Sequence, residues 1–230
     1  NRDYGGGFDA TVNTLARDIA GRVSVGGDFL TFDGAGDWGS GNYHVVFGTG
    51  SGDRESGYAP GGGTDGTVES VAVTSAGRVV VGGTFVSIGG DAQNNIAILD
   101  NGGTVVSAVG PGTGANSTVR SVAIDQNTNQ FLTANIGKII ISGTFSSVQG
   151  AARTRIARLN SDLSLDTTFN PGTGADNPVN SVAIDQNGQV YLVGQFTTVN
   201  GSSRSRIARL KVDGSVDIGF MNGFSGANDI

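Results

Sequence analysis

Cysteine is absent from this 230-residue sequence, histidine occurs once and glutamate occurs twice. Without cysteine the chain has no disulfide framework, no thiolate metal site and no cysteine nucleophile. Acid–base chemistry would need paired aspartates, as in glycosidases, and no motif pairs any two of them. We therefore predict that the chain is not an enzyme and has no catalytic residue, no metal site and no cofactor.

Lysine is also scarce. Lys138 and Lys211 are the only two, and the formal net charge is −6 at pH 7. An acidic chain with so few lysines is a poor partner for nucleic acid or an anionic membrane. No apolar run approaches the length that crosses a bilayer. We expect neither a nucleic-acid partner nor membrane insertion.

Glycine, by contrast, is abundant at 40 residues, and it does not fall at every third position, which excludes collagen. Aspartate greatly outnumbers glutamate, and aspartate and asparagine favour turns whereas glutamate favours helices. Together with many Val, Thr and Ser residues, this composition predicts short strands joined by tight turns.

The sequence repeats itself. Three motifs recur almost unchanged: Pro111–Ala115 at Pro171–Ala175, Ser121–Asn127 at Ser181–Asn187, and Arg155–Leu159 at Arg206–Leu210. Self-similarity at such a period indicates one supersecondary unit copied several times. Each copy opens on a valine, which predicts a single array over 1–230 with repeats of approximately 12–67, 68–118, 119–178 and 179–230.

The fourth copy shows what one unit contains. Three strands are predicted at 179–184, 190–194 and 207–210, with a loop at 199–204, and a fourth strand at 215–217. Glycine-containing turns such as Asp185–Gly188 separate these strands. Each copy is therefore expected to be a four-stranded antiparallel meander.

The second strand of each copy decides between architectures. Val79–Val81 and Ile139–Ile141 are apolar at consecutive positions, which predicts strands buried on both faces. A sheet covered on both faces needs a neighbouring copy on each side. Radial stacking of such sheets gives a β-propeller, here with four repeats of four-stranded blades, alone or within a larger propeller. The alternative is a linear β-solenoid, whose coils are usually shorter than 50 residues.

These motifs carry a family resemblance. Pro-Gly-Thr-Gly-Ala, Val-Asn-Ser-Val-Ala-Ile, Val-Gly-Gln-Phe, Arg-Ile-Ala-Arg-Leu and Asp-Gly-Ser-Val-Asp together resemble the delta-60 repeat family. The resemblance covers nearly the whole chain and is weakest in the first copy. It implies a β-propeller of unknown function from large bacterial secreted or surface proteins or from phage virions, and it supplies no catalytic residues. Because Ile230 falls where a fifth copy would start, we expect the sequence to be a segment of a longer or processed protein.

The first copy holds the candidate ligand site. The connection between Phe29 and Val45, which an insertion makes five residues longer than in the other copies, contains the only Trp and the only His, with the candidate residues Asp33, Asp37, Trp38, Tyr43 and His44. Exposed aromatic rings beside carboxylates can stack on a sugar and accept hydrogen bonds from its hydroxyl groups. Packing of Trp38 at a blade edge is the competing interpretation, and it is favoured because inserted loops are functional only part of the time.

Two further motifs have structural interpretations that we favour over functional ones. Asp125, Asn127 and Asn129 resemble the start of a calcium loop, but Gln130 and Ile136 replace its glycine and glutamate, which favours a hydrogen-bonded turn. Repeated arginines suggest an anion site, but equally periodic aspartates favour ion pairs between strands or blades. These residues are Arg155, Arg158, Arg206 and Arg209, with Asp162, Asp166, Asp213 and Asp217.

From these features we expect a non-enzymatic extracellular, cell-surface or virion protein that presents loops for attachment, host or glycan recognition, or assembly with protein partners. A purely structural spacer or assembly subunit, as in a phage tail or fibre, is the alternative. A polysaccharide-active enzyme that uses aspartates is a third and weaker interpretation.

Overall fold

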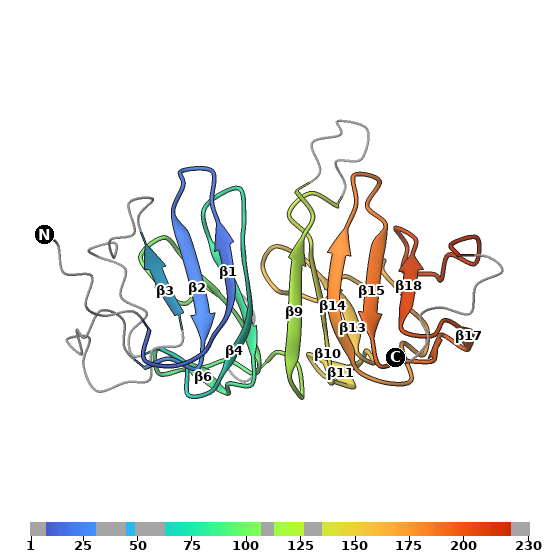
Figure 1. The fold of residues 1–230 in the computed structure, drawn as a ribbon, viewed down its shortest axis with the longest axis horizontal. Helices are drawn as coiled ribbons and strands as arrows, with labels where there is room; N and C mark the ends of the chain where they lie inside the picture. Colours follow the sequence, from blue (N-terminus) through green and yellow to red (C-terminus); the bar gives the residue numbers. More distant parts are fainter. Residues whose placement is uncertain (1–7, 31–44, 49–62, 107–112, 127–134, 222–230) are drawn as a thin grey trace, which may run out of the picture. The chain divides into compact units, whose positions relative to one another are not determined.

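A computed structural model describes residues 8–30, 45–48, 63–106, 113–126 and 135–221 (Figure 1). Over these ranges the chain is all-β, and no helix is long and apolar enough to span a membrane. The chain divides into two compact units, Asn1–Gly114 and Ala115–Ile230, which are described separately below as the N-terminal and C-terminal units.

The N-terminal unit contains two three-stranded antiparallel sheets, ordered β1-β2-β3 and β4-β5-β8, and the hairpin β6-β7. The strand bounds are β1 (Val12–Arg17), β2 (Val23–Gly27), β3 (Val45–Gly48), β4 (Val68–Val73), β5 (Val79–Gly83), β6 (Ser87–Ile88), β7 (Asp91–Ala92) and β8 (Ile96–Leu99).

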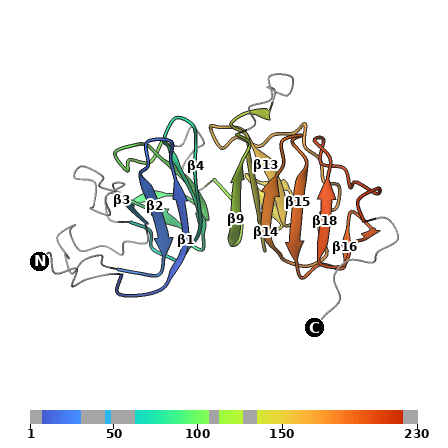
Figure 2. The same ribbon diagram turned by 45° about the horizontal axis from the view of Figure 1, so that its top comes forward.

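The C-terminal unit repeats this plan with the sheets β9-β10-β13 and β14-β15-β18 and the hairpins β11-β12 and β16-β17. Figures 1 and 2 show β14, β15 and β18 beside one another in the fourth repeat. The bounds are β9 (Val119–Ile124), β10 (Ile139–Gly143), β11 (Ser147–Val148), β12 (Ala151–Ala152), β13 (Ile156–Leu159), β14 (Val179–Ile184), β15 (Val190–Gly194), β16 (Thr198–Val199), β17 (Ser202–Ser203) and β18 (Ile207–Leu210).

The first three strands predicted for the fourth repeat have the observed bounds. The predicted fourth strand at 215–217 is shorter in the structure, where a single antiparallel bridge joins Leu210 to Val216. The segment 199–204, predicted as a loop, instead contributes to the hairpin β16-β17. The second, third and fourth repeats therefore each have a three-stranded sheet, a small hairpin and one bridged segment.

The Gly-x-Phe motif marks the end of every second strand for a steric reason. A Cβ atom on Gly83 or Gly143 would lie 2.0 Å from the carbonyl oxygen of Thr67 or Thr118, so no larger residue fits. The phenylalanine two positions later is fully buried, as Phe145 illustrates. Each opening strand also carries a β-bulge beside this glycine, which shifts the register of its pairing with the second strand.

The core of the C-terminal unit lies between its two three-stranded sheets. Ile140 and Ile156 of the third repeat belong to one buried cluster with Val179, Val182 and Leu192 of the fourth repeat. β10 is buried along its whole length, as its consecutive apolar residues predict, and β13 is buried along its whole length too. Facing sheets of adjacent repeats thus share one hydrophobic layer.

Candidate functional site

The residues that the sequence singled out for ligand binding, Asp33, Asp37, Trp38, Tyr43 and His44, lie outside the described residues. Asn127 and Asn129 of the calcium-like motif lie outside them too. Asp125 is described, and its side chain is buried. Within the described part of the chain no three His, Cys, Asp or Glu residues are grouped so that they could hold a metal ion.

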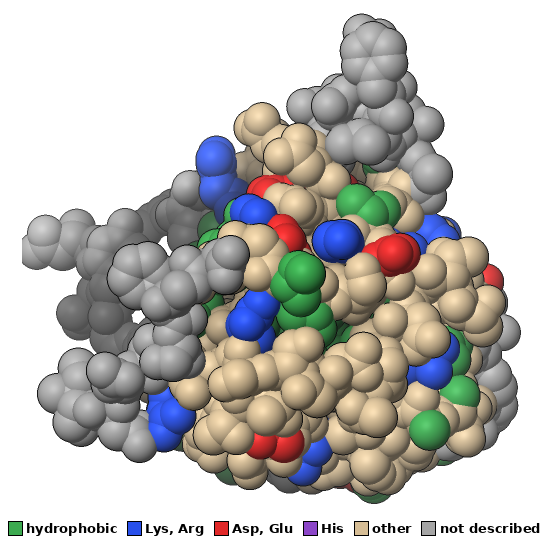
Figure 3. All heavy atoms as spheres, turned by 90° about the vertical axis from the view of Figure 1, so that its right-hand side faces the viewer, with side chains coloured by type: hydrophobic (Ala, Val, Ile, Leu, Met, Phe, Trp, Pro, Cys, Tyr) green, Lys and Arg blue, Asp and Glu red, His purple; other side chains and the backbone are tan. Residues whose placement is uncertain are grey.

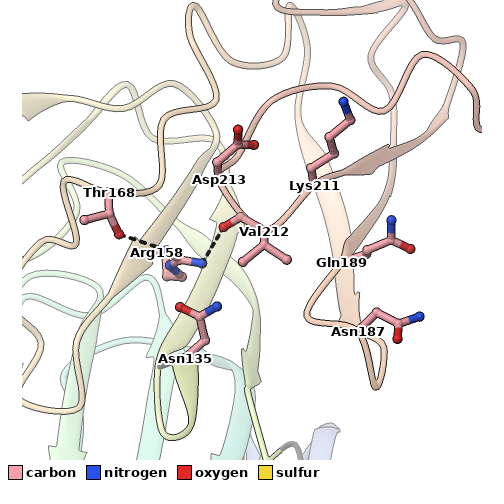
Figure 4. Close-up of a pocket in the computed structure, with 8 residues that line it drawn as sticks. All are labelled: Asn135, Arg158, Thr168, Asn187, Gln189, Lys211, Val212 and Asp213. Atoms are coloured by element: carbon pink, nitrogen blue, oxygen red, sulfur yellow. Dashed lines mark hydrogen bonds between the residues drawn. The ribbon is translucent and has the colours of Figure 1, made fainter. Parts of the chain in front are cut away.

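A surface groove in the C-terminal unit is a candidate site within the described residues (Figure 4). Its volume is about 580 Å³, and its walls come from turns of the third and fourth repeats. The lining residues are Asn135, Arg158, Thr168, Asn187, Gln189, Lys211, Val212 and Asp213. Packing of the two sheets brings these turns together.

Arg158 on β13 is the most buried charged residue of the groove, with 5% of its surface exposed. Its Nη1 donates to the carbonyl oxygen of Val212 at 2.7 Å, and its Nη2 donates to Thr168 Oγ1 at 3.1 Å. The guanidinium also lies 4.9 Å from the centre of the Phe169 ring. Through these contacts Arg158 connects the third and fourth repeats. Few of its guanidinium N–H groups are left to bind a ligand.

The Asp166 carboxylate forms an ion pair with Arg158. Its Oδ2 accepts from Arg158 Nε at 2.8 Å and from Lys138 Nζ at 2.7 Å, and Oδ1 accepts from the Thr168 hydroxyl at 2.6 Å. Burial disfavours the charged carboxylate, but the hydrogen bonds from Lys138, Thr168 and Arg158 outweigh it and hold the pKa of Asp166 well below its usual range. Two cations therefore share one carboxylate that is ionised at neutral pH.

The rim of the groove is different, because its polar groups remain available. Asp185 Oδ1 accepts from the backbone N–H groups of Asn187 and Gln189 at 2.8 and 2.9 Å and thereby holds the turn that carries both amides. In the described part of the chain, the side-chain amides of Asn135, Asn187 and Gln189 make no hydrogen bond. These amides can both donate and accept.

Charge of both signs and an apolar contact complete the rim. Lys211, Val212 and Asp213 follow β18 in one turn. Hydrogen bonds from Ser215 to Asp213 Oδ1 lower the pKa of Asp213, and the Lys211 charge adds to the effect. Asp213 is the only acidic residue that lines the groove, so the described lining holds no carboxylate pair for acid–base catalysis.

The predicted ion pairs are confirmed for two of the four arginines. Arg158 pairs with Asp166, and Arg209 pairs with Asp217 at 2.6 Å. Arg155 instead donates to the Ala175 carbonyl oxygen at 2.7 Å, within the third repeat. The remaining predicted partners, Asp162 and Asp213, accept hydrogen bonds from the serines of their own turns.

Comparison with known proteins agrees with this fold. Residues 137–169 and 186–220 match the family model described as a domain of unknown function (DUF5122) beta-propeller. These segments cover β10–β13 and β15–β18, so the third and fourth repeats are similar to a β-propeller repeat family. The search of curated proteins finds no match.

Two solved structures resemble the chain at low identity. A gluconolactonase from Xanthomonas campestris has a TM-score of 0.49 and 13% identity over 89% of this chain and 60% of its own. A streptogramin B lyase has a TM-score of 0.47 and 14% identity over 92% of this chain and 56% of its own. The chain thus spans no more than 60% of the length of either structure.

Proposed function

We propose that this chain is a non-enzymatic binding module that recognises a glycan or another neutral polyhydroxyl polymer. The observation that carries the proposal is the groove between the third and fourth repeats, where amide side chains without hydrogen-bond partners in the described residues lie beside the half-buried Val212. Amides pair with hydroxyl groups as both donors and acceptors, and Val212 offers a surface for the apolar face of a sugar ring. The hydrogen bonds of Arg158 to Asp166 and to the Val212 carbonyl oxygen connect the two walls of the groove.

The proposal also covers the blade architecture of the chain and the location of the protein. In this proposal four blades, alone or within a larger propeller, form a propeller of the delta-60 repeat type, and a bridged fourth segment such as the one at Val216 completes the second, third and fourth blades. An acidic, glycine-rich repeat protein without cysteine suits an extracellular, cell-surface or virion location, where its protein partners would be neighbouring subunits. The Trp38 loop, outside the described residues, is the second proposed contact with the glycan.

Glycan-array binding followed by calorimetry tests this proposal. The double variant Asn187→Ala/Gln189→Ala removes two rim amides and is expected to weaken binding at least tenfold with an unchanged melting temperature. Ser75→Ala changes an exposed residue in the equivalent turn of the second repeat and serves as the matched control. Trp38→Ala is measured in parallel, so the groove and the loop are tested separately. Wild-type affinity in the double variant would contradict a role for the groove.

The second candidate function is a structural assembly subunit without a ligand of its own. It is favoured by one specific observation, the apolar side chains exposed on described strands, including Leu15 of β1 and Val193 of β15. A chain that assembles normally but binds nothing on a glycan array would support this candidate over the first.

A further inference from the structure

The turn of the hairpin β16-β17 places an asparagine directly before a glycine. Asn200 and Gly201 both have positive φ, and both are exposed. Figure 3 looks onto the fourth repeat from the side on which Figure 1 shows β17, where backbone atoms and uncharged polar side chains (tan) predominate. Gly150, the equivalent glycine of the third repeat, is exposed too, although the fourth repeat packs against that repeat. Exposure of this turn is therefore a property of the repeat itself.

Asparagine before glycine is a reactive pair, because no Cβ atom shields the glycine nitrogen from the neighbouring side-chain amide. The described residues contain three such pairs: Asn101-Gly102, Asn187-Gly188 and Asn200-Gly201. The Gly102 N–H donates to Asp100 Oδ1 at 2.8 Å, and the Gly188 N–H donates to the Asp185 carbonyl oxygen at 3.0 Å. The Gly201 N–H donates to no group in the described part of the chain, and a Cβ atom there would have no neighbour within 4 Å. Of the three glycine nitrogens, that of Gly201 is the one free to react.

The contacts of the Asn200 side chain favour attack on its carbonyl carbon. Its Oδ1 accepts from the Thr173 backbone N–H at 3.1 Å and from the Thr173 hydroxyl group at 3.5 Å. Attack on Cγ moves negative charge onto Oδ1, and donors that are already in position stabilise such an oxyanion. Asn200 Nδ2 donates to no group in the described residues, so the nitrogen that would leave is not held in place.

We propose that Asn200 is a site of spontaneous covalent modification, at which the Gly201 nitrogen displaces the side-chain amide and forms a cyclic imide. The Gly201 N–H gives its proton to hydroxide, the nitrogen bonds to Asn200 Cγ, and the Cγ–Nδ2 bond breaks. The Nδ2 group takes a proton from water and leaves as ammonia. Water then opens the imide at either of its two carbonyl carbons, which gives an aspartyl or an isoaspartyl residue. In the folded protein this reaction is faster at Asn200 than at Asn101 or Asn187.

The isoaspartyl product disturbs the hairpin, because it adds one carbon atom to the main chain of the turn. The turn fixes the pairing of Val199 with Ser202. Val199 is fully buried in the core cluster of the C-terminal unit, and a bridge joins it to Ala175 in the connection that leads into the fourth repeat. The modified chain is therefore expected to have a lower melting temperature than the unmodified one.

Mass spectrometry of the folded protein after incubation at mildly alkaline pH tests the proposal, with peptide fragmentation to assign each modified residue. Asn200 should lose its amide about tenfold faster than Asn101 or Asn187. The same incubation in concentrated urea removes the hydrogen bonds of all three turns, so the three rates should then agree within about threefold.

The variant Asn200→Gln is the matched control, because it copies Gln149, which occupies this turn position in the third repeat. A glutamine side chain is one carbon longer and would have to close a six-membered ring, which is much slower. The variant should therefore keep its melting temperature during the incubation, whereas that of the wild type falls.

Three results would overturn the proposal. In the folded protein, equal rates at the three asparagines would show that the free Gly201 N–H has no influence. An Asn200 that keeps its amide while the unfolded chain reacts would show that the fold protects it. An equal fall in the melting temperatures of Asn200→Gln and the wild type would separate the loss of stability from this site. These readouts are mass and melting temperature, so they are independent of glycan binding.

Discussion

The third and fourth repeats contain the same five residues, Arg-Ile-Ala-Arg-Leu, yet the second arginine has a different environment in each. Arg158 has 6% of its side chain exposed and pairs with Asp166, which is 3% exposed. Arg209 has 25% exposed and pairs with Asp217, which is 14% exposed. Around Arg209 the Tyr191 hydroxyl and the Phe220 ring take the places that Val212 and Phe169 have around Arg158.

The difference comes from the repeat that follows. The fourth repeat covers β13 and supplies the Val212 carbonyl group to Arg158, so a pair that would otherwise be surface-exposed becomes buried. Buried pairs are costly to break, whereas exposed pairs contribute little to stability. Identical sequences therefore have unequal energetic roles, according to whether a neighbour covers them.

The largest expected effect comes from removing the carboxylate of the buried pair. Asp166→Ala leaves Arg158 and Lys138 without their shared partner and should lower the free energy of unfolding by about 3–5 kcal/mol. Asp217→Ala, the matched change in the fourth repeat, should have a much smaller effect. Urea unfolding of both variants measures the difference, and equal losses would show that cover by the fourth repeat is unimportant.

Two equivalent apolar positions, one buried and one exposed, allow the same comparison between the fourth and first repeats. Val182→Ala removes two buried methyl groups and should destabilise the protein by about 2 kcal/mol. Leu15→Ala at the equivalent exposed position should change the stability of the dilute protein by less than about 0.5 kcal/mol. Thermal unfolding provides the measurement. A large effect of Leu15→Ala would mean that β1 is covered in solution.

The hydroxyl contact between repeats gives a smaller effect. Ser121→Ala removes the acceptor of the Val182 N–H and should cost about 1 kcal/mol. Ser181→Ala removes the equivalent hydroxyl of the fourth repeat, which makes no hydrogen bond within the described residues, and should leave the free energy of unfolding unchanged. Denaturant midpoints of the two variants, measured under the same conditions, decide whether the contact stabilises the boundary between repeats.

The smallest effect concerns acid stability. Burial raises the pKa of Asp176, but hydrogen bonds from Thr197 and Thr198 lower it to about 2. A folded-state pKa below the unfolded value of about 3.9 stabilises the protein above that pH, and this contribution is lost as the pH falls from about 4 to about 2. Asn116, at the end of the second repeat, has the same role toward the third repeat, accepting from the Ser146 and Ser147 N–H groups.

Asp176→Asn copies this arrangement and should reduce the fall in melting temperature between about pH 4 and pH 2. Melting curves recorded from about pH 5 to pH 2 provide the measurement. An unchanged pH dependence in the variant would show that the Asp176 carboxylate does not contribute to acid stability.

Much of the fold could be predicted because each signal is local. Three consecutive apolar residues such as Ile139–Ile141 indicate a strand buried on both faces, and the glycine of Gly-x-Phe marks a strand end where a Cβ atom cannot fit. The hairpin β16-β17 was not predicted, because its polar residues with Asn200 and Gly201 have the composition of a loop. Both residues have positive φ, of 46° and 72°, which makes them the tight turn of that hairpin.

The groove could not be predicted from any one motif. Asn187 belongs to an ordinary turn sequence, as does Asp213, and each is explained locally by its own turn. Arg158 was predicted to pair with an aspartate, but its contact with Val212 connects residues 54 positions apart and depends on the packing of two sheets. A polar residue at the tip of each hairpin was the available signal, and it becomes informative only once the neighbouring repeats are placed side by side.

The β-bulge at the start of each opening strand has a consequence for how the repeats can diverge. The register shift leaves Asn13, Glu69, Arg120 and Asn180 out of the regular pairing. These four positions carry neutral, acidic, basic and neutral side chains, although the residues around them are nearly the same in every copy. Because the extra residue is outside the ladder, its side chain can contact the neighbouring repeat: Asn13 Nδ2 donates to the Val68 carbonyl oxygen at 3.1 Å, and Arg120 Nη1 donates to Asn180 Oδ1 at 2.6 Å. A substitution at a bulge therefore alters the contact between two repeats while the hydrogen-bonded sheet stays the same.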